Sequence, residues 1–277
     1  MDPVDGWTAP CLTMDGTERC RVDFSAMCYF YGRNVHSMLA AEGRPRPIGM
    51  IQACWSGSPD EPWMPGSALD KCMQPPRQPG NGGMFNGMIR PLLNTTITGA
   101  IWYQGESDAT HPGGMYDGYN CTFPAMIEGW REQWSVGTGG QTSRSFPFGF
   151  VQLNSVGNGT VYDNPADPTH GDPYSPAFGY GGLRWSQTAG YGRVPNPVQP
   201  NVFMAVSVDT PDRPFPFRSP LNGNFDPGCN VHSPFKQPTA ARLARAGLAN
   251  HYDMSFDTVT PLAGQLSPGK TKGDLVL

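Results

Sequence analysis

Residues 101–108, Ile101-Trp102-Tyr103-Gln104-Gly105-Glu106-Ser107-Asp108, carry the pattern that decides the fold of this chain. An apolar run that begins at Ile97 ends here at four polar side chains placed around one glycine. This pattern is typical of a buried strand that delivers polar groups to the carboxyl edge of a parallel sheet, where open α/β folds bind their ligands. A polar turn with no binding role fits the same pattern, so the rest of the chain must separate the two interpretations.

Apolar runs elsewhere in the chain predict three more buried strands, over residues 47–54, 148–153 and 201–208. Apolar residues at helical spacing predict helices over residues 24–39, 84–93, 123–134, 183–189 and 238–250. Asp23 is the expected cap of the first helix, and Pro238 is expected at the start of the last. Strands that alternate with helices predict an α/β fold, with a four-stranded parallel sheet covered by helices on both faces.

Composition excludes several classes of function. The chain has 277 residues and a net charge of −4, only 15% of its residues are charged, and it has no basic stripe, so nucleic acid is not an expected partner. No segment has the length of a membrane span, and a membrane is not an expected partner either. The seven cysteines form no CxxC pair, so no metal site is expected. The 35 glycines and 30 prolines are spread through long connections and predict a loop-rich fold rather than disorder.

The cysteines and three Asn-x-Ser/Thr triplets, at Asn94, Asn120 and Asn158, favour an oxidising compartment, either lysosomal or secreted. The odd cysteine count predicts at least one thiol without a partner in the chain. The first residues show neither the basic start nor the apolar run of a signal peptide. Two explanations stay open at this point: a cytoplasmic protein, or an amino terminus that lies upstream of Met1.

Three loops follow predicted strands and should converge at one edge of the sheet: residues 55–60, 104–111 and 209–235. The first offers small residues and backbone N–H groups. The second offers the amide of Gln104 and the carboxylate of Glu106, and the third offers His232, preceded by Asp226. Donors for an oxyanion together with a histidine base are the groups that acyl transfer needs.

Each of these groups also has a plainer interpretation. A single histidine in a loop is more often a surface residue than a base, by about two to one on general grounds. His36 is expected to be structural, and the remaining histidines are expected to be solvated: His111, His170 and His251. No serine carries the G-x-S-x-G signature of a nucleophile, so Ser56, Ser58 and Ser107 are interpreted as ordinary loop serines.

At this point the chain resembles the sialate O-acetylesterase family of SGNH-type hydrolases, from about Phe24 to about Tyr252. One of the most specific matches is Trp102-Tyr103-Gln104-Gly105-Glu106-Ser107. The other matching segments are residues 24–33, 47–51, 54–59, 61–63, 119–128, 146–149, 184–189 and 194–197. The resemblance implies a three-layer, flavodoxin-like α/β sheet and the removal of O-acetyl groups from sialic acids or related acetylated sugars, with no cofactor.

The resemblance also implies roles for individual residues. His232 matches the family's catalytic base, and Gly57 matches the position whose backbone N–H helps to hold the oxyanion. Gln104 matches an oxyanion or substrate-binding position, and Glu106 an orienting position. Relatives often carry the acid that orients the histidine two or three residues before it. Asn230 and Cys229 stand there in this chain, so the candidates for that acid are Asp226, the nearest in sequence, and Asp209.

The Gly-Gln-Ser-Asn block that supplies the nucleophilic serine in this family is not found in the chain. The chain is therefore expected to start downstream of that block and to lack the first strand of the sheet. The expected organisation is an irregular lead-in over residues 1–21, a partial SGNH-like esterase domain over 22–252, and a tail or further element over 253–277. Three hypotheses remain: an amino-terminally truncated esterase, a carbohydrate-binding pseudoenzyme without the nucleophile, and a replacement nucleophile at Ser56 or Ser58.

Overall fold

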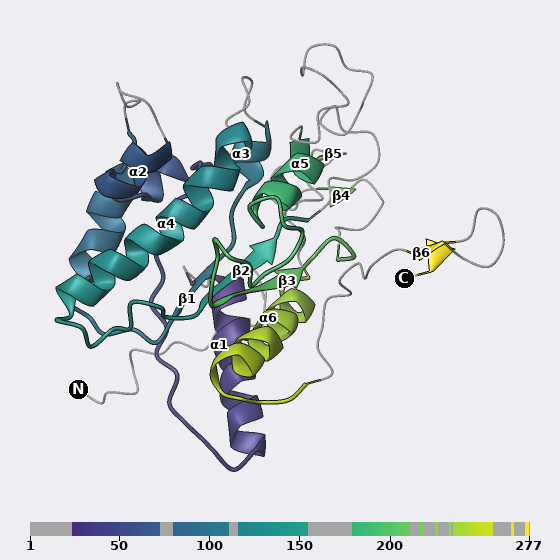
Figure 1. The fold of residues 1–277 in the computed structure, drawn as a ribbon. Helices are drawn as coiled ribbons and strands as arrows, with labels where there is room; N and C mark the ends of the chain where they lie inside the picture. Colours follow the sequence, from purple (N-terminus) through teal and green to yellow (C-terminus); the bar gives the residue numbers. More distant parts are fainter. Residues whose placement is uncertain are drawn as a thin grey trace.

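Three parallel strands form the central sheet of the protein in the order β1-β2-β3 (Figure 1). They are β1 (Ala100–Trp102), β2 (Phe148–Gln152) and β3 (Val202–Val206). Phe148 of β2 is the partner of Ala100 on one side and of Val202 on the other. The three strands therefore end together, and the loops that follow them leave from one edge, which we call the carboxyl edge.

The computed structural model describes residues 24–72, 80–110, 116–154, 179–210, 233 and 235–256, and the short strands β4 to β7. These strands form two small antiparallel pairs: β4 (Phe217–Arg218) with β5 (Phe225–Asp226), and β6 (Ser267–Pro268) with β7 (Leu275–Val276). Within the described part of the chain, no helix is both long and apolar enough to cross a membrane.

Helices cover both faces of the sheet because its strands are apolar on both faces. On one side lie α1 (Ala26–Ala41) and α6 (Lys236–His251), and on the other α4 (Tyr116–Gly137) with α2 (Gly66–Cys72) packed on it (Figure 1). Successive side chains of a strand point to opposite faces. Phe148 and Phe150 accordingly belong to the core beneath α4, whereas Val151 packs with the α1 and α6 side.

The remaining helical segments are short: α3 (Glu106–Thr110), α5 (Gly179–Ser186), η1 (Glu61–Trp63), η2 (Phe85–Ile89) and η3 (Arg90–Leu92). The helices predicted at residues 84–93, 123–134 and 238–250 are confirmed, the first as a π turn followed by a 3₁₀ turn. The predicted cap of α1 is wrong. Ser25 caps this helix, with its hydroxyl oxygen accepting from the N–H of Cys28.

The prediction of a fourth strand over residues 47–54 is also wrong. These residues are described and belong to no strand, so the central sheet has three strands and not four. Their apolar side chains are not deeply covered, and Ile51 is 50% exposed. An apolar run becomes a strand only when a neighbour pairs with its N–H and C=O groups, and no described strand lies beside this one.

Two long-range links fix α4 in place. Arg131 is buried, and its guanidinium donates to the carbonyls of Phe146, Pro200 and Asn201 at 2.7–2.9 Å, just ahead of β2 and β3. A disulfide joins Cys72 at the end of α2 to Cys121 in α4. Both links set the position of the helix that carries Tyr119 and Thr122 to the carboxyl edge of the sheet.

Candidate functional site

Two of the three loops expected to converge do meet at the carboxyl edge. The amide nitrogen of Gln104, just after β1, donates to the carbonyl oxygen of Ser58 at 3.1 Å. The backbone N–H of Asp60 donates to a carboxylate oxygen of Asp108 at 3.4 Å. The convergence predicted for residues 55–60 and 104–111 is therefore confirmed for the described residues of both loops.

The amide group of Gln104 is the centre of this contact. Besides the carbonyl of Ser58, its nitrogen donates to the second carboxylate oxygen of Asp108, and its oxygen accepts from the hydroxyl of Tyr119 at 3.1 Å. A glutamine amide has two N–H donors, and both are used here. In this structure Gln104 therefore holds one loop against another.

Gly105 makes the turn that places Gln104 and Glu106. Its φ of +135° is one that residues with a side chain rarely adopt, and a Cβ at this position would lie 2.4 Å from Cδ2 of Leu183. Leu183 is fully buried in α5. Glycine therefore allows the chain that follows β1 to pass close to α5 and to turn directly into α3, which begins at Glu106.

Behind Gln104 lies a cluster of buried carboxyl groups: Asp60, Glu61 and Asp108. Burial, opposed by the hydrogen bond from Gln104 and assisted by the neighbouring charge of Glu61, raises the pKa of Asp108 to about 7. Burial also raises the pKa of Asp60 well above its usual value, with the charges of Asp108 and Glu61 adding to the effect. Two acids this close in an apolar interior are expected to share protons rather than ionise together.

This cluster is the one group among the described residues whose ligand type and spacing suit a metal ion, since its carboxylate oxygens lie within 4.8 Å of one another. Three of its oxygens already have donors. Asp60 Oδ2 accepts from the Thr122 hydroxyl at 2.6 Å, and both oxygens of Asp108 accept hydrogen bonds. These bonds and the protons that the raised pKa values retain stabilise the carboxyl groups of Asp60 and Asp108 in the interior.

The serines of the first loop differ in their surroundings. Ser58 is 9% exposed, and its hydroxyl donates to the carbonyl of Trp55 at 2.8 Å and accepts from the indole N–H of Trp63 at 2.9 Å. Ser56 is exposed at the turn that precedes it. No histidine within the described ranges contacts either hydroxyl, so neither serine is arranged as an activated nucleophile.

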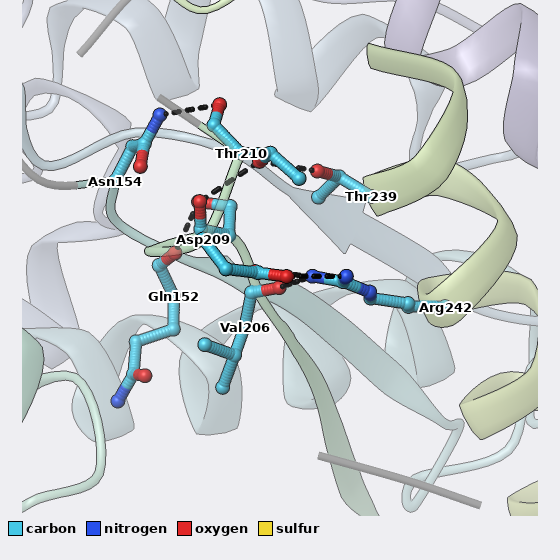
Figure 2. A network of polar contacts seen from close by, with 8 residues as sticks. Gln152, Asn154, Val206, Asp209, Thr210, Thr239 and Arg242 are labelled. Atoms are coloured by element: carbon cyan, nitrogen blue, oxygen red, sulfur yellow. Dashed lines mark hydrogen bonds and ion pairs between the residues drawn. The ribbon is translucent and has the colours of Figure 1, made fainter. Parts of the chain in front are cut away.

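The third loop begins at the end of β3, where a polar network ties the strand to α6 (Figure 2). Arg242 of α6 binds both carboxylate oxygens of Asp209 at 2.6 Å and the carbonyl of Val206 at 2.9 Å. The carbonyl of Thr210 accepts from the amide of Asn154 at 3.0 Å. Asp209, one candidate to orient a histidine, thus has its carboxylate directed to Arg242, which lowers the pKa of Asp209.

A charged contact extends the site toward α6. The ammonium of Lys236, the first residue of α6, lies 4.7 Å from the centre of the Tyr103 ring at the end of β1. Burial lowers the pKa of Lys236, while the charge of Glu106 acts in the opposite direction. Burial, followed by the charge of Glu106, raises the pKa of Tyr103 to about 12. The amino end of α6 therefore stands beside the loop that carries Gln104 and Glu106.

The two residues predicted to form the catalytic pair are not both placed. His232 lies outside the described residues, and of Asp226 the structure gives only its backbone pairing with Phe217 in the β4-β5 pair. Gly57 lies in an exposed turn with φ +72°. Nδ1 of His36 donates to the carbonyl of Arg46 at 2.8 Å, and the ring of His251 meets that of Tyr252 edge to face, both away from the carboxyl edge.

Sequence reasoning missed Asp60, Asp108, Tyr119 and Lys236 as members of the site. For Asp108 a signal was present, because it closes the polar run that follows β1. Tyr119 lies on the same face of α4 as Phe123, whose ring stacks on it at 5.2 Å, so helical spacing alone marks it as a core residue. Nothing in the local sequence predicts that its hydroxyl reaches Gln104.

The proteins that this chain resembles in sequence and in structure are acetylesterases that act on carbohydrates. The model of a family described as carbohydrate esterase, sialic acid-specific acetylesterase, matches residues 20–165. The sialate O-acetylesterase of Homo sapiens is 38% identical over 250 residues, which cover 86% of this chain and 42% of that protein. That of Rattus norvegicus is 34% identical over 277 residues, covering 86% of this chain and 45% of the rat protein.

Among solved structures, a novel carbohydrate acetylesterase from Xanthomonas citri matches with a TM-score of 0.58 and 26% sequence identity. The match covers 88% of this chain and 45% of the bacterial one. The chain therefore spans less than half the length of the relatives that it matches.

Proposed function

This chain belongs to the sialic acid-specific acetylesterase family of carbohydrate esterases, and from that premise we propose that it forms part of a hydrolase that removes O-acetyl groups from sialic acids or related acetylated sugars. The observation that carries the proposal is the meeting of the loops after residue 54 and after β1 at the carboxyl edge, through Gln104 and Ser58. Ligands of parallel α/β sheets bind at this edge.

In the proposed reaction, His232 takes the proton of a serine nucleophile and returns it to the departing sugar hydroxyl. The backbone N–H of Gly57 donates to the oxyanion that forms on the acetyl carbon. Gln104 supports this donor, because it binds the carbonyl of Ser58, the next residue along the loop. We assign Gln104 a positioning role in addition to the substrate contact that the family resemblance implies, and Glu106 an orienting role.

We propose further that the nucleophilic serine is not among the residues of this chain. Ser58 is held by Trp55 and Trp63 and Ser56 is exposed, which supports neither as the nucleophile. Loss of a triad nucleophile leaves only about 10³–10⁴-fold of the catalytic acceleration. The chain alone is then expected to bind O-acetylated sialic acid and to release acetate at a rate far below that of a complete enzyme.

The test measures acetate release and ligand binding by the purified chain, with O-acetylated sialic acid as ligand and human sialate O-acetylesterase as the positive control. Binding without release, weakened in Gln104→Ala, supports the proposal. Release at the rate of the control that is lost in His232→Ala and kept in Ser56→Ala and Ser58→Ala would show a nucleophile elsewhere in the chain. Absence of both binding and release would refute the assignment of the site.

The same observation on Ser56 and Ser58 favours a second candidate function, a carbohydrate-binding protein that does not turn over its ligand. Joining the serine-bearing segment of the human relative to the amino end of this chain separates the two. Recovered acetate release shows that base and oxyanion loops are competent for hydrolysis. Binding that persists without release in this chimera favours the pseudoenzyme.

The finer description of the fold belongs to the same proposal. We propose a flavodoxin-like sheet in which one further strand pairs between residues 47–54 and β1. Residues 47–54 pair with no described strand, and β1 is the edge of the three-stranded sheet, which supports the proposal. Hydrogen exchange tests it: the amides of residues 47–54 should exchange fast in this chain and become protected in the chimera.

We also propose that the protein works in a lysosomal or secreted setting. The Cys72–Cys121 disulfide and the exposed side chain of Asn94, within an Asn-x-Thr triplet, support an oxidising compartment. Expression of the full-length protein in human cells, followed by glycosidase treatment and cell fractionation, tests this. A protein that carries no glycan and is found in the cytosol would contradict it.

A further inference from the structure

Residues 48–54 run along α1 with alternate side chains turned toward the helix. A Cβ built on Gly32 of α1 would lie 2.9 Å from the sulfur of Met50 and 3.7 Å from a methyl of Ile48. Toward the start of the helix, the backbone N–H of Ser25 donates to the side-chain oxygen of Gln52. Because side chains of an extended segment alternate in direction, Cys54 is the next residue on this helix-facing side.

Cys28 occupies the matching position on the helix. It is three residues after Ser25 and four before Gly32, the spacings that place residues on one face of a helix. Its N–H donates to the Ser25 hydroxyl at 3.4 Å, and the side-chain amide of Gln52 reaches the sulfur of Cys54 at 3.2 Å. The Ser25–Gln52 contact is therefore linked to Cys28 through Ser25 and to Cys54 through Gln52.

The electrostatics of Cys28 agree with this placement. Burial raises the pKa of its thiol, the hydrogen bond with Ser25 opposes the rise, and the charge of a Cys54 thiolate adds to it. Cys54 is exposed, whereas Cys28 is partly covered. Among the described cysteines, these are the two that are not in a disulfide.

We propose that Cys28 and Cys54 are a covalent modification site, at which oxidation forms a second disulfide that joins residues 47–54 to α1. The oxidant is a small-molecule disulfide of the glutathione class. The thiolate of exposed Cys54 attacks it, forming a mixed disulfide and releasing one glutathione. The thiolate of Cys28 then attacks the Cys54 sulfur and releases the second glutathione. Two protein thiols lose two protons and two electrons, and one glutathione disulfide becomes two thiols.

The Cys28–Cys54 disulfide would hold a segment that pairs with no described strand of the sheet. Residues 47–54 have no strand partner, and they lead directly to the loop of Ser58 and Asp60. A crosslink to α1 shortens the free length of the segment, and it should slow proteolytic cleavage within residues 47–54 about tenfold or more, since cleavage requires local opening.

The experiment incubates the purified full chain with oxidised and reduced glutathione, blocks free thiols by alkylation and maps the disulfides by mass spectrometry without reduction. We expect a Cys28–Cys54 crosslinked peptide and a thiol count lower by two. In Cys54→Ser the crosslink is lost and Cys28 becomes alkylated. The matched control, Ala53→Cys with Cys54→Ser, moves the thiol by one residue to the other side of the segment and should not form the crosslink.

Three outcomes would overturn the proposal. One is a map in which Cys54 is joined to Cys11, Cys20 or Cys229. Another is a pair of thiols that stays reduced under conditions in which the Cys72–Cys121 disulfide forms. The third is equal crosslinking by the control variant, which would show a mobile segment instead of a fixed facing direction.

Discussion

Raising the pH from about 5 to about 8 should lower the free energy of unfolding of this protein, and Asp108 should be one of the causes. Burial raises the pKa of this carboxyl to about 7 in the folded chain from an ordinary value of 3.8. The folded state therefore binds more protons than the unfolded state between these two values. By linkage, the stabilising contribution is fully present below about pH 4 and is lost as the pH rises to about 7.

The magnitude follows from the size of the rise. Each unit of pKa corresponds to about 1.4 kcal/mol, so a rise from 3.8 to about 7 corresponds to about 4 kcal/mol between about pH 4 and 7. About 3 kcal/mol of this loss falls above pH 5. Asp60 acts in the same direction, because its pKa is also raised. The pKa of Asp209 is lowered by its exposed ion pair, so the small contribution of that pair, about 0–1 kcal/mol, is lost only below about pH 4 and gives no slope between pH 5 and 8.

Urea unfolding at a series of pH values measures the effect. The wild-type chain should lose stability steadily toward neutral pH. Asp108→Asn cannot ionise, so its profile should be flatter, and a residual slope should report Asp60 with its pKa brought closer to the ordinary value. At about pH 5 the variant should be less stable by about 1–3 kcal/mol, because the amide NH2 group would face one of the two donors that now bind Asp108 and, unlike either oxygen of a carboxyl, cannot accept from it.

Asp209→Asn serves as the control and should keep the slope of the wild-type profile. Stability that is constant or rises between about pH 5 and 8 would refute the reasoning. An Asp108→Asn profile as steep as that of the wild type would refute the assignment to this residue.

Three further changes test other contacts. Gly105→Ala should destabilise the chain by about 2–5 kcal/mol in thermal unfolding, because backbone strain at φ +135° adds to the clash with Leu183. Gly57→Ala, with φ +72° and open space around it, should cost only about 1 kcal/mol, and equal losses would contradict the clash. Arg131→Lys keeps the charge but loses the planar guanidinium that binds three carbonyls, so urea unfolding should show a free energy of unfolding lower by about 3 kcal/mol. An unchanged midpoint would mean that these carbonyls find other donors. Reduction of the Cys72–Cys121 disulfide should lower the free energy of unfolding by about 4 kcal/mol for its separation of 49 residues, and a double serine variant should match the reduced protein.

Local pattern predicted the elements whose burial is decided by neighbours in sequence. The runs at residues 148–153 and 201–208 became β2 and β3, and the helical stripe from Phe123 to Trp134 became the inner face of α4. Residues 47–54 have as strong an apolar run and form no strand, because a strand depends on the hydrogen-bonding groups of another segment.

The candidate site also has features that the sequence predicted and contacts that it could not predict. The polar run after β1 and the glycine-containing loop after residue 54 could be placed together from sequence, since the loops after parallel strands share one edge. That Gln104 uses its whole amide group to hold Ser58, Asp108 and Tyr119 could not be inferred, because these partners come from three separate segments.

By itself, the sequence determined the family, the α/β class and the loops that line the carboxyl edge, because periodicity and rare motifs are properties of neighbouring residues. Only the tertiary structure decided which acids keep their protons and which cysteines lie across from one another. Asp60 and Asp108 stand 48 positions apart in the chain and meet only when α4 packs on the sheet and excludes water from both. A pKa depends on that surrounding medium, which no stretch of sequence contains.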